Sequence, residues 1–417
     1  MIKTFQFKLK PNTKQRDLLD NWLNLLRMQY NYRLAQRFNW YEQNRSNVNA
    51  CSLVCHLPEL KEQPNYYSQK KDLLNTKKLF PDYKNVQSQV LQDCIKRVDK
   101  TFSRWLKQDK SGRRSGRPRF KGKGRYRSFT FPQTLLDCIQ GKQIKFSKIG
   151  LIKFIKHREI PQGFLIKTAT IIKKANGFYV NLSVENKSIP DFKPDTIPSL
   201  NNTIGIDMGL KEFLVCSDGV RVEIQQYYRL SAARLRRLQK SLSRKKKGSN
   251  NWLKAVEKVA KLHQHISDKR KDFHYNVAKL LINKADVIAH EKLNIKGLAK
   301  TRFSKSILDA GWGMFLQILK CKAENAGVKV IEVNPNGTSV ECSNCGAKVP
   351  KTLKDRIHSC GDCDIELCRD LNASINIKYR AVGHSVALAY RVTEAIAGVG
   401  KKPTLTASAE VMGVCHY

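Results

Sequence analysis

Acidic residues are scarce in this chain. Its 417 residues include 35 Asp and Glu against 77 Lys and Arg, which gives a formal net charge of +42. A compact protein that carried this charge alone would lose stability to self-repulsion, so we expect a polyanionic partner. Nucleic acid is the first candidate, and an anionic membrane surface is the competing one.

The sequence also lacks the features of a membrane or secreted protein. No apolar run approaches the roughly 20 residues of a membrane span, and the N-terminal MIKTFQFKLK has no apolar core of a signal peptide. A hydrophobic content of 41% excludes disorder of the whole chain. We therefore expect a cytoplasmic protein of about two to four domains. Its twelve cysteines then suggest metal ligands and buried thiols rather than disulfides.

Hydrophobic periodicity divides the N-terminal half into helices and short strands. A strand is predicted over 2–10, ended by Pro11, and helices over 13–42 and about 85–107. In the first helix, aromatic residues form the predicted core, and arginines that include Arg33 and Arg37 form a solvated rim. Short apolar runs at 128–131, 143–146, 151–154, 166–173 and 178–184 predict a small barrel or sheet. Residues 186–202 hold three prolines and read as a linker.

Basic residues are densest in a glycine-rich loop over 107–127, where so many like charges favour phosphate contact over a solvated face. At the start of the second helix, Lys84, Ser88 and Gln92 suit contacts to base edges. A merely solvated helix face is the more common explanation of such residues. Further on, helices are predicted over 231–242 and 251–283, with a basic turn between them. The predicted nucleic-acid contacts outside 84–92 are Arg117, Arg119, Lys121, Lys123, Arg125, Arg127, Arg244, Lys245 and Lys246.

The stretch TIGIDMGLKEFLVCSDG at 203–219 organises the second half of the chain. It predicts a strand, a short turn and a second strand, with a hairpin partner over 220–224. Asp207 falls mid-strand, between Gly205 and Gly209 on the same face. Glycines there clear room for a bulky partner near the backbone, and a carboxylate in such a groove suits a metal-dependent phosphodiesterase site. An ordinary strand-end aspartate is the alternative.

Two further acids occupy related positions. Glu291 ends a short buried strand predicted over 286–289, and Asp370 lies in the first turn of a helix that carries Leu371 and Ile375 on one apolar face. An acid at a helix start also interacts favourably with the macrodipole, which is the alternative for Asp370. The order strand, strand end and helix start describes an RNase H-like fold. In that fold such carboxylates hold two divalent ions, for which Mg²⁺ suits the oxygen ligands.

Paired cysteines predict a zinc site. Residues 342–363 read C-SN-C, fourteen residues, then C-GD-C, which supplies Cys342, Cys345, Cys360 and Cys363. Four thiolates in two knuckles match tetrahedral zinc, and full cysteine coordination indicates a structural ion. A redox pair of disulfides is the alternative. His358 and Cys368 lie nearby, but the paired spacing argues against either as a ligand. A strand over 328–333 precedes this region, after a helix over 312–326.

Several of these motifs together resemble the transposon-encoded TnpB (OrfB) proteins, RNA-guided nucleases related to type V CRISPR effectors. The resemblance covers nearly the whole chain. The matching segments are GRPRFKGKGRYRSFTFPQ at 116–133, GIDMGLKEFLVCSDG at 205–219, IAHEKLNIKGL at 288–298, TSVECSNCG at 338–346 and RDLNASINI at 369–377. By this resemblance Asp207, Glu291 and Asp370 are the three RuvC acids and the four cysteines are the ribbon ligands. Cys368 departs from the family, where an acid or histidine is more usual.

The resemblance implies a multidomain α+β and α/β protein. An N-terminal β-barrel (wedge) domain at 1–11 and 111–195 would carry an inserted helical recognition domain at 12–110. An RNase H-like RuvC nuclease domain would span 196–335 and 367–385, with an inserted zinc ribbon at 336–366 and a C-terminal tail at 386–417. It also implies a guide RNA from the transposon end, a double-stranded DNA target near the prokaryotic nucleoid and a short flanking DNA motif. We expect a monomer.

Three functions remain open on the sequence. The first is Mg²⁺-dependent, RNA-guided cleavage of DNA, with two magnesium ions and one structural zinc ion. The second is an RNA-guided DNA-binding regulator without nuclease activity, which loss of an acid would favour, yet all three acids are present. The third is a transposase that transfers DNA strands itself on an RNase H-like scaffold.

Overall fold

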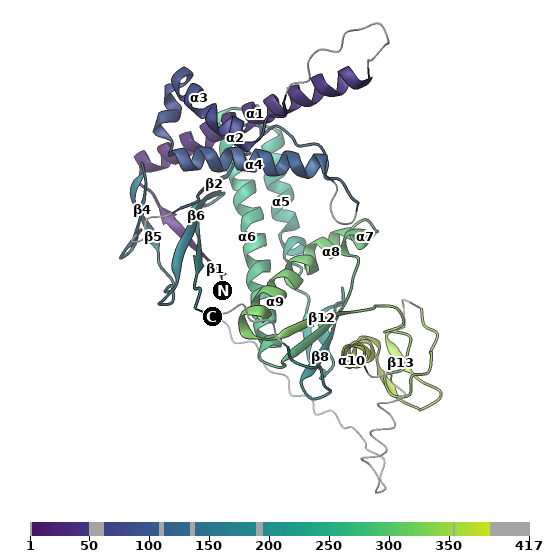
Figure 1. Cartoon of the computed structure of the whole chain (residues 1–417). Coiled ribbons are helices and arrows are strands. Elements are labelled where there is room, and N and C mark those ends of the chain that lie inside the picture. The colour runs from purple at the N-terminus through teal and green to yellow at the C-terminus, as the bar shows by residue number, and fades with distance from the viewer. Residues whose placement is uncertain are drawn as a thin grey trace. The chain divides into compact units, whose positions relative to one another are not determined.

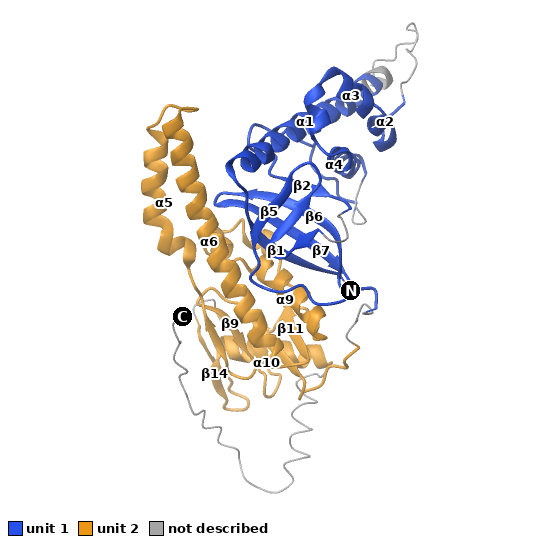
Figure 2. Ribbon diagram, turned by 90° about the vertical axis from the view of Figure 1, so that its left-hand side faces the viewer, with its two compact units in different colours: residues 1–191 blue, residues 192–417 orange. Residues whose placement is uncertain are grey.

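The computed structural model describes residues 2–49, 62–107, 112–133, 138–188, 195–352 and 355–383. The chain divides into two compact units, Met1–Asp191 and Phe192–Tyr417 (Figure 2). The predicted tail over 386–417 lies outside the described residues. Among the described helices, none combines the length and the apolar character needed to cross a membrane.

A seven-stranded antiparallel sheet forms the centre of unit 1, with the strand order β2-β6-β7-β1-β5-β4-β3. Strands β2 and β3 form its edges, and no hydrogen-bonded ladder between them is seen in the described residues. A closed barrel is therefore not established. The strands are β1 (Ile2–Lys10), β2 (Ser128–Phe131), β3 (Ile139–Gln140), β4 (Gln143–Phe146), β5 (Gly150–Ile155), β6 (Leu165–Lys174) and β7 (Gly177–Glu185).

Helices of unit 1 share one hydrophobic core with this sheet (Figure 1). Trp22 of the long first helix is fully buried, and its ring lies 5.6 Å from that of Phe129 on β2. Burial of large aromatic side chains between helix and sheet stabilises both elements together. The helices are α1 (Thr13–Asn49), α2 (Tyr66–Lys71), α3 (Leu73–Leu79), the 3₁₀ turn η1 (Pro81–Asn85) and α4 (Ser88–Leu106).

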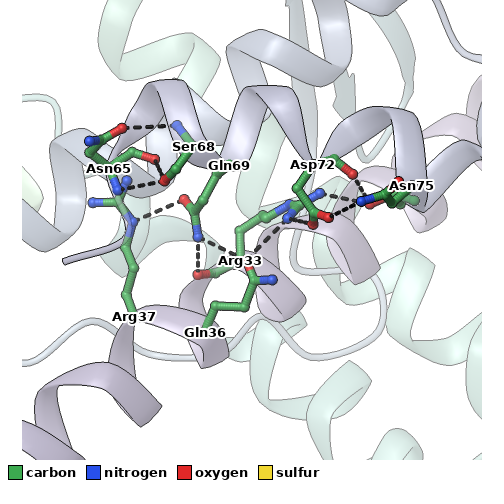
Figure 3. A network of polar contacts seen from close by, with 9 residues as sticks. Arg33, Gln36, Arg37, Asn65, Ser68, Gln69, Asp72 and Asn75 are labelled. Carbon is green, nitrogen blue, oxygen red and sulfur yellow. Dashed lines mark hydrogen bonds and ion pairs between the residues drawn. The ribbon is translucent and has the colours of Figure 1, made fainter. Parts of the chain in front are cut away.

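Two buried arginines of α1 hold the short helices in place (Figure 3). The Arg33 guanidinium contacts the Asp72 carboxylate and donates to the Thr76 hydroxyl at 2.7 Å. Arg37 donates to the Gln69 side chain at 3.0 Å and pairs with Asp99 at 2.8 Å. The predicted solvated rim is therefore wrong for Arg33 and Arg37, which are 0% and 1% exposed. A buried guanidinium requires such partners, and α2 and α3 supply most of them.

Unit 2 contains a five-stranded mixed sheet with the order β10-β9-β8-β11-β12. The strands β8, β9 and β10 pair antiparallel, whereas β11 lies parallel to both β8 and β12. The strands are β8 (Thr203–Asp207), β9 (Glu212–Cys216), β10 (Arg221–Glu223), β11 (Val287–Glu291) and β12 (Lys329–Val333). A two-stranded ribbon, β13 (Ile357–Ser359) and β14 (Glu366–Cys368), follows later in the chain.

Helices pack on both faces of the five-stranded sheet. One face, with Ile206 and Ile288, shares a core with α6 (Asn250–Ile282) and α9 (Trp312–Ala326). The other face, with Ala289 and Val333, packs against Ile377 of α10 (Arg369–Val382). The remaining helices of unit 2 are α5 (Tyr227–Ser243), α7 (Ile295–Leu298) and α8 (Ser304–Ala310).

The backbone of α10 crosses β8 directly over Gly205. A Cβ atom at residue 205 would lie 2.1 Å from the Ser374 carbonyl oxygen and 2.6 Å from the Lys378 nitrogen. The bulky partner that the glycine admits is therefore this helix. Leu371 and Ile375 share one face of α10, as their spacing predicts, and both are half-buried. The buried residues of the helix are Asn372, Ala373, Ser374, Asn376 and Ile377.

We predict that Gly205→Ala displaces α10 and lowers the free energy of unfolding of unit 2 by about 2–3 kcal/mol, because neither backbone atom can yield without moving the helix. Gly313→Ala is the matched control: its new Cβ would meet only the Ile295 Cδ1 atom, at 3.8 Å. We expect that control to change stability by less than about 1 kcal/mol. Hydrogen exchange of the amides of β8 and α10 measures the effect, and equal protection in both variants would contradict the prediction.

Candidate active site and metal centre

Asp207 and Glu291 lie at the same edge of the five-stranded sheet. Strands β8 and β11 are parallel neighbours in which Ile206 pairs with His290, and the two acids are the next residue on each strand. The structure places Asp207 at the end of β8 rather than in mid-strand. Side chains alternate along a strand, so Asp207 lies on the face of Gly205, and Glu291 lies on the face of Ala289. Both acids therefore face α10.

Asp370 reaches this edge from the first turn of α10. The Arg369 Nε atom lies 3.4 Å from an Asp370 carboxylate oxygen, and the helix crosses β8 at Gly205. Asp370 and Glu291 both act electrostatically on Asp207. The fold thus brings the three predicted acids into one electrostatic neighbourhood, from residues that are up to 163 positions apart (370 − 207).

The electrostatics of this neighbourhood favour a bound cation. Burial, together with the charges of Glu291 and Asp370, raises the pKa of Asp207 to about 7, against the opposing effect of Arg369. Burial also raises the pKa of Glu291, although the Thr338 hydroxyl donates a hydrogen bond to it. Gathered carboxylates with so little positive compensation fit a hard divalent ion, whose preferred ligands are carboxylate oxygens.

Four cysteine thiols form a separate cluster that could hold a metal ion. The Sγ atoms of Cys342, Cys345, Cys360 and Cys363 all lie within 4.8 Å of one another. The Sγ distances are 3.7 Å for 342–363 and 3.5 Å for 345–360. A tetrahedral zinc ion with Zn–S bonds of about 2.3 Å requires about 3.8 Å between sulfurs, so the cluster fits zinc. These separations exceed a disulfide bond of about 2.0 Å, and the four cysteines are free thiols in the structure.

His358 and Cys368, the two nearby residues that could also bind a metal, lie outside this cluster. His358 is buried on β13 and its Nδ1 atom contacts the Lys351 ammonium. Cys368 pairs in the β13–β14 ladder opposite Ile357 and immediately precedes α10. In the described residues, the four predicted cysteines are the one group of such side chains that stands this close together.

Sequence reasoning missed the residues that hold the acids in position. Thr338 donates to Glu291 from 47 residues away. Asn372 and Asn376 of α10 bind the main chain of residues 338–343, on both sides of Cys342. The signal that could have found them is the pair of asparagines four residues apart, because that spacing places both side chains on one face of the helix.

A small polar pocket lies at the start of α4 in unit 1. Its volume is about 270 Å³, and Gln87, Gln89, Gln133 and Lys145 contribute to its walls together with Phe131 and Phe146. Gln89 donates to the Gln133 side chain at 2.7 Å, and Gln87 donates to Gln89 at 3.2 Å. Amides beside aromatic rings suit contacts to nucleic-acid bases.

The predicted base contacts lie around this end of α4. Lys84 is exposed on η1, and its carbonyl oxygen accepts from the Lys148 ammonium. Ser88 is exposed and accepts from Lys77 at 2.8 Å, while Gln92 is half-buried one turn further along. Gln133 had not been predicted, because its contact with Gln89 joins segments 44 residues apart.

The basic loop is partly docked on α1. The Arg117 guanidinium stacks on the Phe38 ring at 4.4 Å and pairs with Glu42 at 2.7 Å. Lys121 exchanges two main-chain hydrogen bonds with the Asn31 side chain. These two residues therefore have a structural role. Arg119, Lys123, Arg125 and Arg127 are exposed.

The second basic cluster lies in the turn between two helices of unit 2. Arg244 caps the C-terminal end of α5, and Lys245 and Lys246 follow before α6 begins at Asn250. Arg244 and Lys246 are exposed, and Lys245 is half-buried. Cations at a helix C-terminus are favoured by the helix dipole, which accounts for part of this charge without a ligand.

Comparisons with known proteins agree on one family. Three family models match: "Cas12f1-like, TNB domain" at 312–377, "Probable transposase" of the OrfB_IS605 type at 182–302, and the OrfB_IS605 "Helix-turn-helix domain" at 1–46. The last name does not describe this structure, where the segment forms β1 and one continuous helix.

Relatives match this chain over very different shares of its length. The chain is 24% identical over 420 residues to the putative RNA-guided DNA endonuclease InsQ of Escherichia coli K12, covering 97% of this chain and 98% of that protein. It is 39% identical over 77 residues to the putative transposase MJ0856.1 of Methanocaldococcus jannaschii, covering 16% and 71%. A solved Cas12f1–sgRNA–target DNA complex aligns with a TM-score of 0.47 and 14% identity, over 91% and 98% of the two chains.

The raised pKa of Asp207 predicts a pH-dependent loss of stability in the absence of divalent ions. The folded carboxyl keeps its proton up to about pH 7, whereas the unfolded one loses it near pH 4. Stability should therefore fall as the pH rises from about 4 to about 7 and stay constant above that. Asp207→Asn removes this loss and should be more stable than the wild type by on the order of 3 kcal/mol above pH 7.

Melting curves between pH 4.5 and 8 measure this difference. Mg²⁺ should raise the melting temperature of the wild type more than that of Asp207→Asn, because an ion that binds only the folded state stabilises it. Asp218→Asn, at an exposed ion pair with Lys284, is the control and should follow the wild type. Parallel pH profiles for wild type and Asp207→Asn would contradict the prediction.

Proposed function

The chain belongs to the TnpB (OrfB) family of transposon-encoded relatives of type V CRISPR effectors, and on this premise we propose that it is an RNA-guided DNA endonuclease. It would cut target DNA beside a short flanking motif by phosphodiester hydrolysis. The observation that carries the proposal is the position of Asp207, Glu291 and Asp370 at one sheet edge, where Glu291 and Asp370 both act on the ionisation of Asp207.

The sheet topology supports an RNase H-like RuvC domain. Three antiparallel strands are followed by two parallel ones in the order β10-β9-β8-β11-β12, and the acids lie at the ends of the neighbouring strands β8 and β11. The ribbon lies in the chain between β12 and α10, as expected of an insertion. We assign 196–335 and 367–385 to this domain, 336–366 to the ribbon, 1–11 and 111–195 to the wedge, and 12–110 to the recognition part.

Each residue of the site has a separate task in this proposal. The carboxylates of Asp207, Glu291 and Asp370 hold two magnesium ions. When bound, such ions activate the attacking water and stabilise the leaving oxygen. The Thr338 hydroxyl fixes one oxygen of Glu291, and Arg369 lies beside Asp370 at 3.4 Å. The four cysteines hold one structural zinc ion and take no part in the chemistry.

Base pairing with a guide RNA would choose the target, and the protein would hold the duplex through its backbone. The net charge of +42 supports such a partner. The amide-lined pocket at the start of α4, with Lys84, Ser88 and Gln92 nearby, supports reading of the flanking motif in unit 1. We propose that the protein acts as a monomer in the cytoplasm, on DNA of the nucleoid.

Asp207→Ala tests the mechanism. We expect cleavage of a guided plasmid to fall by at least about 10³-fold, because removal of one acid empties the ion site. Binding of guide RNA and target DNA should stay within about twofold. Glu212→Ala, which replaces an acid of the neighbouring strand β9 that pairs with Arg221, is the matched control and should cut at the wild-type rate. Wild-type cleavage by Asp207→Ala would overturn the mechanism.

The name "putative transposase" among the relatives supports one competing function. A transposase of this fold would join DNA strands with purified transposon ends and without RNA. One reaction with labelled transposon-end DNA distinguishes the two proposals. Strand-transfer products from RNA-free protein support the transposase, and cuts that require guide RNA support the nuclease. Guided binding without cuts in Mg²⁺ would instead indicate a regulator.

The exposed part of the basic loop supplies a test of phosphate contact. Replacing Arg119 and Lys123 together with alanine should weaken guide-RNA binding and reduce the slope of log affinity against log salt by about 2, because each contact releases counterions. Lys167→Ala is the control, since that lysine pairs with Glu185 at 2.8 Å on the sheet. Filter binding at several salt concentrations measures the slopes, and an unchanged slope in the double variant would exclude these contacts.

A further inference from the structure

Three polar side chains on one face of α10 form hydrogen bonds to the same segment of the chain. Asn372, Asn376 and Arg380 are four residues apart, so they lie on one face of the helix. All three bind residues 334–343, the segment between β12 and the first zinc knuckle. The two asparagines are 0% and 1% exposed, so these contacts are formed away from solvent.

The asparagines grip the main chain of this segment. The Asn372 Oδ1 atom accepts from the Ser343 N–H at 2.9 Å, and its Nδ2 atom donates to the Glu341 carbonyl at 2.8 Å. The Asn376 Nδ2 atom donates to the carbonyls of Thr338 and Glu341 at 2.9 and 2.7 Å. Main-chain contacts on both sides of Cys342 fix the path of the chain into the first knuckle.

Arg380 fastens the earlier part of the same segment. Its guanidinium donates to the carbonyls of Asn334 and Asn336 at 2.8 and 2.6 Å, and to the Glu341 carboxylate at 2.7 Å. Between these contacts the chain turns at Gly337, which has a φ of +83°. This left-handed conformation favours glycine, and a Cβ there would also require the Glu341 side-chain oxygen, 2.7 Å away, to shift.

The same segment also contacts the acid site. The Thr338 hydroxyl donates to Glu291, while the Thr338 carbonyl accepts from Asn376. One residue thus joins a carboxylate on β11 to the helix that carries Asp370. Four residues later the segment supplies Cys342 and, after one more turn, Cys345 to the thiol cluster.

The second half of the ribbon leads into α10 without a linker. Strand β14 ends at Cys368 and α10 begins at Arg369. The Arg369 N–H donates to the Arg356 carbonyl at 2.8 Å, on the chain that enters β13. The thiol cluster therefore lies between two connections, one to Glu291 through Thr338 and one to Asp370 through the helix start.

We propose that the zinc ribbon is a positioning element of the acid site, and that Asn372 and Asn376 are the positioning residues that connect the two. Closure of the ribbon around its metal fixes residues 338–343, and that segment fixes Glu291 relative to α10. The inference rests on the proposed nuclease function for the identity of the site. Its central measurement, the retention of zinc, does not depend on cleavage.

Matched variants of α10 test the connection in the full chain. Asn376→Ala should accelerate zinc release to a chromogenic chelator by about tenfold. It should also raise the Mg²⁺ concentration for half-maximal cleavage by about tenfold, because residues that hydrogen-bond to metal-ligand segments affect metal affinity by this amount. Target-DNA affinity should stay unchanged. Ser374→Ala is the control: Ser374 is equally buried on the same helix, but its hydroxyl donates only to the Leu371 carbonyl. It should match the wild type in both measurements.

Thr338→Val distinguishes the link to Glu291 from the link to the ribbon. Valine has nearly the same shape as threonine, so the variant is expected to fold. It removes the hydroxyl bond to Glu291 and keeps the Thr338 carbonyl that Asn376 binds. We expect a raised Mg²⁺ requirement with zinc release at the wild-type rate. Removal of zinc from the wild type should raise the Mg²⁺ requirement in the same way, because coupling between two sites is reciprocal.

Several outcomes would overturn the inference. Wild-type zinc release in Asn376→Ala excludes the link to the ribbon, and an unchanged Mg²⁺ requirement in Thr338→Val excludes the link to Glu291. Equal effects of Asn376→Ala and Ser374→Ala would mean that both report only on the packing of α10. If Asp207→Ala cuts normally, the proposed function fails, whereas the zinc-release comparison still decides whether the asparagines hold the ribbon.

Discussion

The close approach of α10 to β8 is the constraint on which the acid site depends. The helix carries Asp370 in its first turn, and its backbone lies so near the strand that a single methyl group at residue 205 would overlap it. Hydrogen bonding within the sheet fixes Asp207 and Glu291 relative to each other. This packing contact, together with the hydrogen bonds of α10 to residues 338–343, sets the position of the third acid relative to those two.

The acid site is costly to the fold, and the rest of the chain does little to reduce that cost. Burial and the neighbouring acids raise the pKa of Asp207, even though the chain has 77 basic residues against 35 acidic ones. Within the described part of the chain, Arg369 acts on Asp207 and Arg380 acts on Glu291. Buried carboxylates lower the stability of the fold when no ion is bound. Such a cost is expected at a site whose residues are selected for binding rather than for stability.

Local patterns predicted the parts of the molecule whose partners are near in sequence or share a fixed spacing. Helix α9 has the predicted bounds, including the left-handed Gly327 that ends it. Strands β1, β2 and β4 also have the predicted bounds, and the four cysteines gather as their spacing indicated. The roles of Asp207, Glu291 and Asp370 stay a prediction. The places of Glu291 at a strand end and Asp370 at a helix start follow from the same local reasoning, whereas Asp207 lies at the end of β8 and not in mid-strand as predicted.

Contacts between polar side chains and distant main chain could not be predicted in this way. The sequence predicts a solvated rim for Arg33 and Arg37 because their partners on α2 and α3 are more than 30 residues away. The sequence around those partners also shows no strong hydrophobic periodicity that would predict a packed helix. The asparagines of α10 follow the same logic. The spacing of Leu371 and Ile375 shows that they share a face but not which face is buried, and the buried Asn372 and Asn376 bind carbonyl and amide groups that only the folded segment 338–343 presents. Where part of a helix packs against irregular chain, as α10 does beside its contact with the sheet, hydrogen-bonding capacity decides which polar side chains are buried, because unpaired buried main-chain groups are costly.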